Sequence, residues 1–293
     1  MTPGFWNLVL AGGAGRRLEG VTGGVPKQFW SVDGRRTMVE HTVGRVLGMI
    51  PPSRVVTVIG PGQEQHARRL VEARGLGRIV PQRVDRGTGI ATLAGLAEIL
   101  RHEDDPVVLL TPADHGIACV AEYRAGVRRA VAAVSAGRHD VVLFGVVPTE
   151  AAPDYGWILP RASRVRRAFH PVDAFVEKPP LHEAAALLGA GGLWNTLVVV
   201  ARARALLALF EARLPGLADT IIGRTSPPEG WPVVDLSGDI LTNAAGLAVY
   251  VWPDSLGWSD LGTPARLAQW LRNTVTPLAI GRPLPPVARR LTA

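Results

Sequence analysis

The chain contains 293 residues, of which 47% are hydrophobic and 19% are charged, as in a packed globular protein rather than a disordered one. Its net charge is +7, but the basic residues are scattered singly or in pairs without an aromatic-rich basic stripe, which argues against a nucleic-acid surface. The single cysteine, Cys119, excludes an intrachain disulfide, and no run approaches the roughly 18 apolar residues of a membrane span. We therefore expect a soluble, cytoplasmic protein that binds neither nucleic acid nor a membrane, and a homodimer stays open.

Apolar runs of strand length alternate with helical patterns through the first half of the chain. Strands are expected at residues 7–11, 54–60, 78–81, 106–110 and 140–147, and helices at 37–49, 63–74, 90–102 and 118–135. Such alternation predicts an α/β fold with a mostly parallel central sheet and helices on both faces.

The second half has longer gaps between its strands. Strands are expected at residues 156–160, 172–176, 197–201 and 247–252, and helices at 181–188, 204–213, near 240 and at 264–272. No repeat or polar linker separates independent units. We therefore expect one domain over residues 1–272, in two halves (1–147 and 148–272), followed by a Pro-rich, extended tail at 273–293.

A glycine-rich loop follows the first strand at residues 10–18. Glycines let backbone N–H groups approach phosphate oxygens, and Arg17 adds a positive charge. A dinucleotide fold would have a carboxylate at the end of the second strand, where this chain has glycine and proline at 60–62. A P-loop would have Gly-Lys-Ser/Thr, which is missing here. The loop therefore indicates another kind of phosphate site, with a ligand-free tight turn as the alternative.

Lysine is rare in this chain. Of 32 basic residues, only Lys27 and Lys178 are lysines, and the rest are arginines. An ammonium is a compact, mobile point charge, whereas a guanidinium is a planar fork. The two lysines are therefore candidates for sites where a compact ammonium is required and a planar guanidinium would not fit.

Aspartates stand at two places where a ligand could bind. Asp114 comes just after the strand at 106–110, at the edge of the sheet where α/β proteins collect ligands. One carboxylate there suits Mg²⁺, which takes its other ligands from water and substrate phosphates. Capping of the following helix is the alternative for Asp114, and helix capping is likewise the alternative for Asp260.

A series of short segments resembles, in order, the motifs of sugar-phosphate nucleotidyltransferases, most closely the mannose-1-phosphate guanylyltransferase branch. These segments are residues 10–18, 25–30, 109–115, 155–158, 175–179, 194–197 and 256–262, and the resemblance spans roughly residues 8–271. It implies a Rossmann-like nucleotidyltransferase fold whose first half binds the nucleotide and whose second half binds the sugar phosphate.

The resemblance also implies roles for individual residues. The catalytic residues would be Arg17, Lys27 and Asp114. The nucleotide would be bound by Ala11, Gly12, Gly13, Gly15, Arg17, Lys27, Gln82, Gly87 and Thr88. The sugar phosphate would be bound by Tyr155, Gly156, Glu177, Lys178 and Asn195, and Mg²⁺ by Asp114 and Asp260.

The expected reaction joins a nucleoside triphosphate and a sugar-1-phosphate into a nucleotide sugar and pyrophosphate, and the resemblance favours GTP and mannose-1-phosphate. Two departures bear on the substrates. Thr196 and Leu197 stand where the branch has Ser-Gly, and Gln82 stands where it has glutamate. An amide offers one acceptor and two donors, which match uracil or thymine as readily. UTP or dTTP with a hexose-1-phosphate, and a catalytically silent nucleotide-sugar-binding homologue, are the alternatives.

Overall fold

The computed structural model describes residues 4–13, 15–74, 77–162, 167–221 and 230–274. Its strands are β1 (Phe5–Ala11), β2 (Val55–Ile59), β3 (Arg78–Pro81), β4 (Val107–Pro112), β5 (Gly116–Ile117), β6 (Val141–Val146), β7 (Gly156–Pro160), β8 (Phe169–Glu177), β9 (Leu193–Arg202), β10 (Leu247–Val251) and β11 (Trp258–Ser259). Its helices are α1 (Glu19–Thr22), α2 (Met38–Val46), α3 (Glu64–Arg74), α4 (Gly87–Leu100), α5 (Val120–Ser135), α6 (Leu181–Gly189), α7 (Ala203–Arg213), α8 (Leu217–Ile221) and α9 (Pro264–Thr274). Short helical turns are η1 (Arg16–Leu18), η2 (Lys27–Phe29), η3 (Pro52–Arg54), η4 (Leu236–Leu241) and η5 (Asp254–Leu256). None of the helices in these ranges combines the length and apolarity that a bilayer crossing requires.

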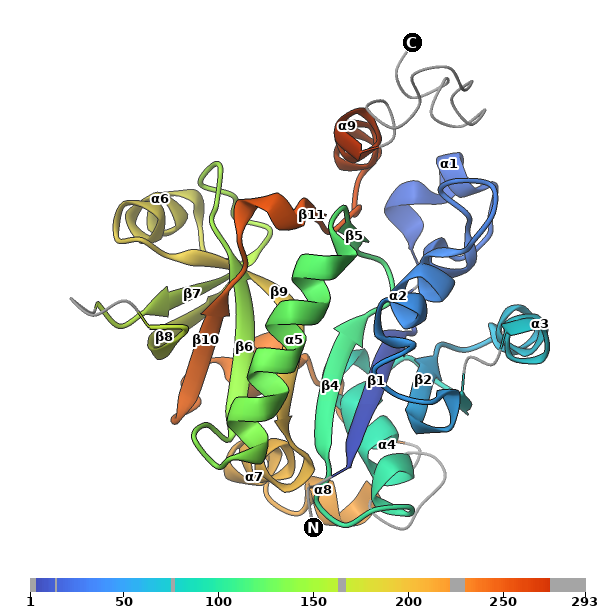
Figure 1. Cartoon of the computed structure of the whole chain (residues 1–293), viewed down its shortest axis with the longest axis horizontal. Helices are drawn as coiled ribbons and strands as arrows, with labels where there is room; N and C mark the ends of the chain where they lie inside the picture. Colours follow the sequence, from blue (N-terminus) through green and yellow to red (C-terminus); the bar gives the residue numbers. More distant parts are fainter. Residues whose placement is uncertain (1–3, 14, 75–76, 163–166, 222–229, 275–293) are drawn as a thin grey trace.

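A single nine-stranded sheet joins the two halves of the chain, in the order β3-β2-β1-β4-β9-β6-β10-β8-β7 (Figure 1). The pairings make seven of these strands point the same way, while β8 and β9 run in the opposite direction. The expected α/β class with a mostly parallel sheet is thus confirmed. What the sequence did not predict is that β9 lies between β4 and β6 and pairs antiparallel with both.

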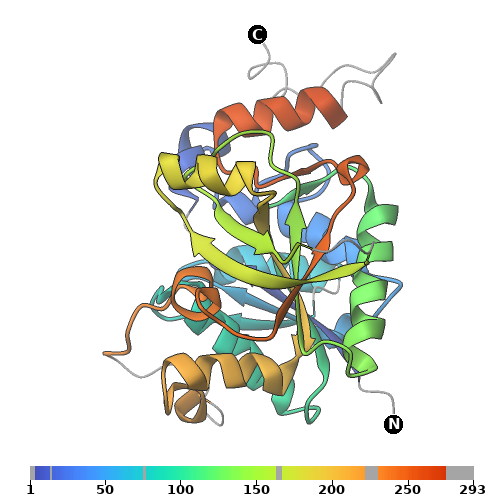
Figure 2. The ribbon, with the colours of Figure 1, turned by 90° about the vertical axis from the view of Figure 1, so that its left-hand side faces the viewer.

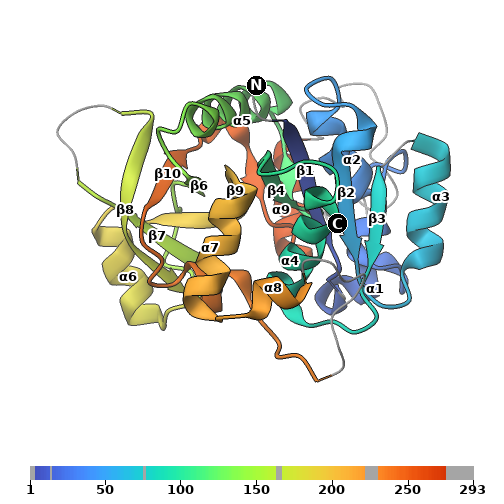
Figure 3. The ribbon, with the colours of Figure 1, turned by 90° about the horizontal axis from the view of Figure 1, so that it is seen from below.

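Helices cover both faces of the sheet. Seen from below, α2 and α5 lie on one face and α4, α7 and α8 on the other (Figure 3). Strand β1 is buried on both sides, because Leu8 and Leu10 pack in one hydrophobic cluster and Val9 and Ala11 in the other. This two-sided burial explains its continuous apolar sequence, which a half-exposed strand would interrupt with polar residues.

The last described helix returns to the N-terminal part of the chain. Helix α9 lies at the same end of the molecule as α6 (Figure 2). Its Leu267 and Leu271 pack with Leu18 and Met38, which follow strand β1 in the chain. This packing places the segment before α9, which contains Asp260, beside the loops that follow β1.

Several bounds differ from the sequence prediction. Strands β8 and β9 begin three and four residues earlier than expected, and the helix expected near 240 is the π-helical turn η4. Helix α8 and the short β5–β11 pair were not predicted. Helix α9 continues to Thr274, so the predicted start of the tail at 273 falls inside it, and residues 275–293 lie outside the described residues.

Candidate active site

A cavity of about 290 Å³ opens beyond the carboxyl ends of β1 and β4. Its walls come from the glycine-rich loop, the turn η2, the end of β4 and the segment before α9, and they include six of the residues expected to act on the nucleotide. Those six are Ala11, Gly13, Gly15, Arg17, Lys27 and Asp114. The remaining lining residues are Leu10, Gln28, Ala113 and Gly262. The structure therefore brings the loop, the lysine and the aspartate together at the sheet edge where ligands bind in open α/β folds.

Two glutamines hold the glycine-rich loop in place. Gln28 is buried, and its side-chain amide donates to the backbone carbonyls of Ala11 and Gly13 and to Oε1 of Gln63. Gln63 in turn accepts from the backbone N–H of Gly60 at 3.0 Å. The Gln63 amide also donates to the backbone carbonyls of Gly12 and Gly13, at 3.4 and 3.5 Å. Both glutamines therefore fix the backbone of the loop. Sequence reasoning missed both glutamines; the position of Gln28 directly after Lys27 was the available signal.

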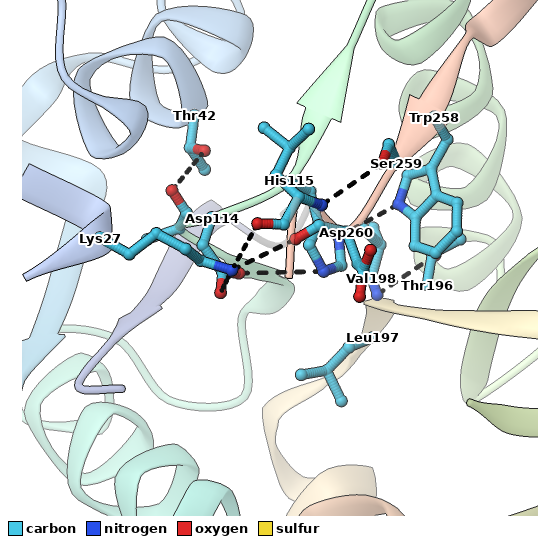
Figure 4. Close-up of polar contacts among 12 residues, drawn as sticks. Lys27, Thr42, Asp114, His115, Thr196, Leu197, Val198, Trp258, Ser259 and Asp260 are labelled. Atoms are coloured by element: carbon cyan, nitrogen blue, oxygen red, sulfur yellow. Dashed lines mark hydrogen bonds and ion pairs between the residues drawn. The ribbon is translucent and has the colours of Figure 1, made fainter. Parts of the chain in front are cut away.

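Lys27 contacts three segments of the chain: the end of β4, the segment before α9 and the glycine-rich loop. It is 7% exposed, and its Nζ lies 2.8 Å from Oδ2 of Asp114 (Figure 4). The same ammonium donates to the backbone carbonyls of Asp260 and Leu261, each at 3.3 Å. Gly15 has a positive φ of 65°, and a Cβ on it would lie 3.0 Å from Cβ of Lys27. Glycine therefore allows the loop to pack directly on the lysine.

Asp114 is ionised in this setting. Burial by itself would raise its pKa, but the Lys27 ammonium and the nearby His115 hold that pKa below its usual value. The His115 ring accepts from the indole N–H of Trp258 at Nδ1, 3.1 Å away, and its Nε2 is 3.8 Å from Oδ1 of Asp114. Burial lowers the pKa of His115 to about 4, so the ring is neutral at pH 7.

Asp260 lies two residues before Gly262, which contributes to the wall of the cavity. Its Oδ1 accepts from the Tyr155 hydroxyl at 3.2 Å and its Oδ2 from Nη1 of Arg266 at 3.0 Å. A Cβ on Gly262, which lines the cavity, would lie 2.7 Å from Oδ2 of Asp260 and 3.3 Å from Nη2 of Arg17. The two aspartates thus approach one lysine, Asp114 with its carboxylate and Asp260 with its backbone carbonyl. Sequence reasoning missed Arg266, which also pairs with Asp154 at 2.7 Å.

The side chains around Asp114 and Asp260 determine what kind of metal ion could bind there. In the part of the chain that the structure describes, no group of three or more His, Cys, Asp or Glu side chains is arranged to hold an ion. The Asp114 carboxylate lines the cavity, and that of Asp260 lies beside Gly262 of its wall. Such carboxylates suit an ion such as Mg²⁺ that takes its remaining ligands from phosphate oxygens and water. The metal role of Asp114 and Asp260 stays a prediction.

The expected sugar-phosphate residues lie at the ends of β7, β8 and β9. Nζ of Lys178 is 2.8 Å from Oε1 of Glu177, and the lysine side chain is 60% exposed. Burial raises the pKa of Glu177, while its bond to Lys178 opposes that rise. A Cβ on Gly156 would lie only 2.5 Å from Oε2 of Glu177, so the glycine makes room for this carboxylate.

Asn195 is held within the protein. It is 9% exposed, its Oδ1 accepts from the backbone N–H of Leu197 at 3.1 Å, and its Nδ2 donates to Oγ of Ser237 at 3.4 Å. Leu197 has a φ of 54°, the left-handed region that favours glycine. The pairing of β9 with β6 shifts register here, so Thr196, Leu197 and Val198 form a bulge. Leu197, which stands where the guanylyltransferase branch has glycine, therefore keeps a backbone conformation that favours glycine.

The segment expected to face the base does not line the cavity. Gln82 is 2% exposed, and its Nε2 is buried with no hydrogen-bond partner in the described residues. Oε1 of Gln82 would lie 3.1 Å from a Cβ on Gly12, so this side chain borders the glycine-rich loop. Gly87 and Thr88 begin α4. The Thr88 hydroxyl donates to Oδ2 of Asp235 at 3.0 Å, a partner that sequence reasoning missed because it is 147 residues away.

Comparisons with known proteins agree with the resemblance seen in the motifs. A family model described as nucleotidyl transferase matches residues 6–275. A mannose-1-phosphate guanylyltransferase of Sinorhizobium fredii is 30% identical over 287 residues, which cover 90% of this chain and 54% of that protein. The enzyme of the same name from Escherichia coli is 31% identical over 284 residues, which cover 88% and 58%. The chain therefore spans about half the length of the curated relatives it matches.

Solved structures give the same fold. A structure from Thermus thermophilus, described as a mannose-1-phosphate geranyltransferase, is 26% identical with a TM-score of 0.80, over 92% of this chain and 79% of that one. A UDP-glucose pyrophosphorylase in complex with UDP-glucose is 14% identical with a TM-score of 0.66, over 94% and 99%. The second likeness bears on the fold alone.

Proposed function

Since the chain belongs to the nucleotidyl transferase family, we propose that it transfers a nucleotidyl group from a nucleoside triphosphate to a sugar-1-phosphate and releases pyrophosphate. The observation that carries this proposal is the contact of Lys27 with Asp114 and with the backbone of Asp260, at the cavity beside the glycine-rich loop. A buried lysine at the carboxyl ends of the strands is suited to binding a polyphosphate, and the two aspartates are suited to holding a cation that would accompany it.

In the proposed reaction, an oxygen of the sugar-1-phosphate forms a bond to the α-phosphorus of the triphosphate. The bond between that phosphorus and the α,β-bridging oxygen breaks, and its electron pair leaves with pyrophosphate. The protein has little covalent chemistry to do; it must align two polyanions that repel each other and stabilise the charge of the transferred group.

Each positive group has a place in this alignment. The backbone N–H groups of the glycine-rich loop, with Arg17 and Lys27, line the cavity and would hold the phosphates that leave as pyrophosphate. Lys178 is an exposed cation next to Glu177 in the sugar half and would hold the phosphate of the acceptor. The Lys178 ammonium already pairs with Glu177, so binding of the acceptor phosphate would rearrange this ion pair.

We further propose that Asp114 and Asp260 hold Mg²⁺. A bound divalent ion would neutralise part of the charge on the phosphates. Asp114, whose side chain is 37% exposed, is the ligand open to the cavity, while Asp260 is fixed from behind by Tyr155 and Arg266. The negative charge of both carboxylates is balanced at this edge by Lys27 and Arg266.

For the substrates we propose GTP and mannose-1-phosphate. The support is the resemblance of the motifs and the names of the relatives, which are mannose-1-phosphate guanylyltransferases. The buried, unpartnered amide of Gln82 bears on the base. An amide can donate to O6 and accept from N1–H of guanine, and it can pair in the same way with O4 and N3–H of uracil or thymine. UTP and dTTP with a hexose-1-phosphate are therefore the alternative substrates.

A pyrophosphate-release assay with four nucleoside triphosphates and several sugar-1-phosphates tests the proposal. Release that requires both GTP and mannose-1-phosphate is the expected result, and Asp114→Asn is the matched inactive control. Faster release with UTP or dTTP would select the alternative substrates. Tight nucleotide-sugar binding without release for any pair would instead identify a silent binding protein.

A further inference from the structure

A second cavity, of about 550 Å³, lies behind the loop that carries Asp114. We call it the α2–α5 cavity, because its walls come from the segment before α2, from α2 itself, from the loop 115–118 and the start of α5, and from the end of α9. His115 and Leu261 line it, although Asp114 and Lys27 do not. It is therefore separate from the proposed nucleotide site, although residues adjacent in sequence line the two cavities.

The charged side chains around this cavity are mostly positive. Three arginines and one aspartate line it: Arg36, Arg45, Arg124 and Asp33. The Asp33 carboxylate is engaged by the backbone N–H groups of Arg35 and Arg36, at 2.8 and 2.9 Å, and by His41 at 3.1 Å. Among the described residues, Asp33 forms no ion pair with a guanidinium group.

Arg45 is a buried cation without an anion. It is 6% exposed, and in the described part of the chain no carboxylate forms an ion pair with it. Its Nη1 donates to Oγ1 of Thr42 at 3.3 Å and its Nη2 to the backbone carbonyl of His115 at 2.5 Å. Two of its five N–H groups are thus used. Burial lowers its pKa to about 10, so the group is still charged at pH 7.

Arg36 brings a second guanidinium to the same wall. A Cβ on Gly44 would lie 3.8 Å from Nη1 of Arg36, so this guanidinium lies beside the residue that precedes Arg45. Arg36 is exposed, and among the described residues it too forms no ion pair with a carboxylate. Arg36 and Arg45 thus bring two guanidinium groups to the walls of one cavity, and guanidinium N–H groups are donors that bind phosphate oxygens well.

Much of the remaining lining is apolar. Val32, Met38, Ile117 and the indole of Trp270 contribute to the walls. The volume falls in the range of cavities that hold small organic ligands, which are typically lined by apolar groups with a few fixed polar ones. An inorganic ion would leave this apolar surface unused, whereas an organic phosphate would cover it.

We propose that the α2–α5 cavity binds a phosphomonoester with an apolar group, whose phosphate contacts Arg36 and Arg45 and whose apolar part packs near Trp270. This site does not depend on the proposed reaction, because its residues lie outside the nucleotide cavity. Arg45 also holds the carbonyl of His115, next to Asp114, so the ligand would bind against the residue that positions the loop of the nucleotide site.

Calorimetric titration of the full chain with phenyl phosphate tests this site without requiring turnover. We expect one binding site, weaker binding of inorganic phosphate, and weaker binding of benzoate, which carries a single charge. Arg36→Ala should weaken phenyl phosphate binding at least about tenfold through loss of a charge-assisted contact. The matched control is Arg128→Ala, an exposed arginine of α5 outside the cavity, which should bind as the unmodified chain does.

The nucleotide cavity is the competing location for the probe. Lys27→Met should leave phenyl phosphate binding in place if the α2–α5 cavity holds it. Loss of binding in Lys27→Met together with full binding in Arg36→Ala would overturn the proposal. Absence of binding to the unmodified chain at millimolar phenyl phosphate, or equal binding of benzoate, would overturn it as well.

Discussion

The ammonium of Lys27 lies 2.8 Å from the carboxylate of Asp114, although the two residues follow different strands of the sheet. Besides its proposed role in the reaction, each residue also stabilises the structure of the site. Asp114 compensates the charge of a lysine that is 7% exposed, and Lys27 ties the end of β4 to the segment that contains Asp260. The proposed chemistry and the stability of the site therefore depend on the same pair.

Asp114→Asn should lower pyrophosphate release by about a hundredfold or more, because a charge-stabilising group is lost. It should also lower the free energy of unfolding by about 1–3 kcal/mol, since the buried ammonium loses its anionic partner. The double variant Lys27→Met/Asp114→Asn should recover much of that stability without recovering turnover. Denaturant titration and the release assay measure the two effects separately. Undiminished release by Asp114→Asn would contradict the assignment.

Thr42→Val tests how helix α2 positions Asp114. The Thr42 hydroxyl donates to the carbonyl of Ala113 at 3.4 Å and accepts from Arg45, whose other amino group holds the carbonyl of His115. The residues on both sides of Asp114 are thus fixed from α2. Valine has the same shape without the hydroxyl, so we expect a loss of about 1 kcal/mol in stability and a several-fold lower kcat with little change in KM. Thr42→Ser keeps the hydroxyl and should restore kcat; equal kcat in Thr42→Val would show that the bond has no positioning role.

Local sequence predicted the parts of the fold that depend on local pattern. β1 and β4 are buried on both faces, so their apolar runs were unambiguous. The glycine-rich loop, Lys27 and Asp114 could be placed because each follows a strand directly. The full length of β9 could not be predicted, because its first residues include the polar Asn195 and Thr196. These side chains are buried and form hydrogen bonds to Ser237 and to the backbone of Phe144, which a local pattern does not reveal.

Contacts between segments that are distant in the chain could not be predicted from local sequence patterns. Arg266 belongs to an amphipathic helix, and only the fold shows that it reaches Asp260 and Asp154. Asp235 caps the turn η4 and meets Thr88 across the two halves. Neither residue belongs to a short motif, so a local pattern could not distinguish it from other surface charges.

Lys178→Arg should raise the KM for the sugar-1-phosphate about tenfold and leave the KM for the triphosphate unchanged. The guanidinium of the variant is planar and larger than the ammonium. It could bind the neighbouring Glu177 carboxylate in bidentate fashion and would then be less available to the acceptor phosphate. Arg161→Lys, at an exposed ion pair with Asp173, is the matched control and should change neither constant. Steady-state kinetics with each substrate varied in turn provides the measurement. An unchanged KM for the sugar-1-phosphate in Lys178→Arg would argue against the proposed contact.

Asp33 should contribute to stability only above acidic pH. Burial would raise its pKa, but the backbone N–H groups of Arg36 and Arg35 and the nearby His41 outweigh it, so the pKa is lowered from 3.8. Because the folded value lies below the unfolded one, the contribution is complete above the unfolded pKa and disappears as the pH falls through the folded value. Asp33→Ala should therefore lower the Tm at pH 7, and the difference should shrink below pH 3.8. A difference that stays constant or grows down to about pH 2.5 would contradict this reasoning.

Leu197 provides a test of backbone strain at the sugar half. At an ordinary position Gly is less stable than Ala by about 0.5–1 kcal/mol, because glycine loses more backbone freedom on folding. Leu197 has a φ of 54°, where a Cβ is unfavourable by about 1–2 kcal/mol, so the order should be reversed. Leu197→Gly should unfold at higher denaturant than Leu197→Ala, since both lose the packing of the side chain and only glycine relieves the strain. The side chain of Leu197 packs against a hydrophobic cluster of the core, and this is the packing that both variants lose. If Leu197→Ala were the more stable of the two, the left-handed backbone at this position would be refuted.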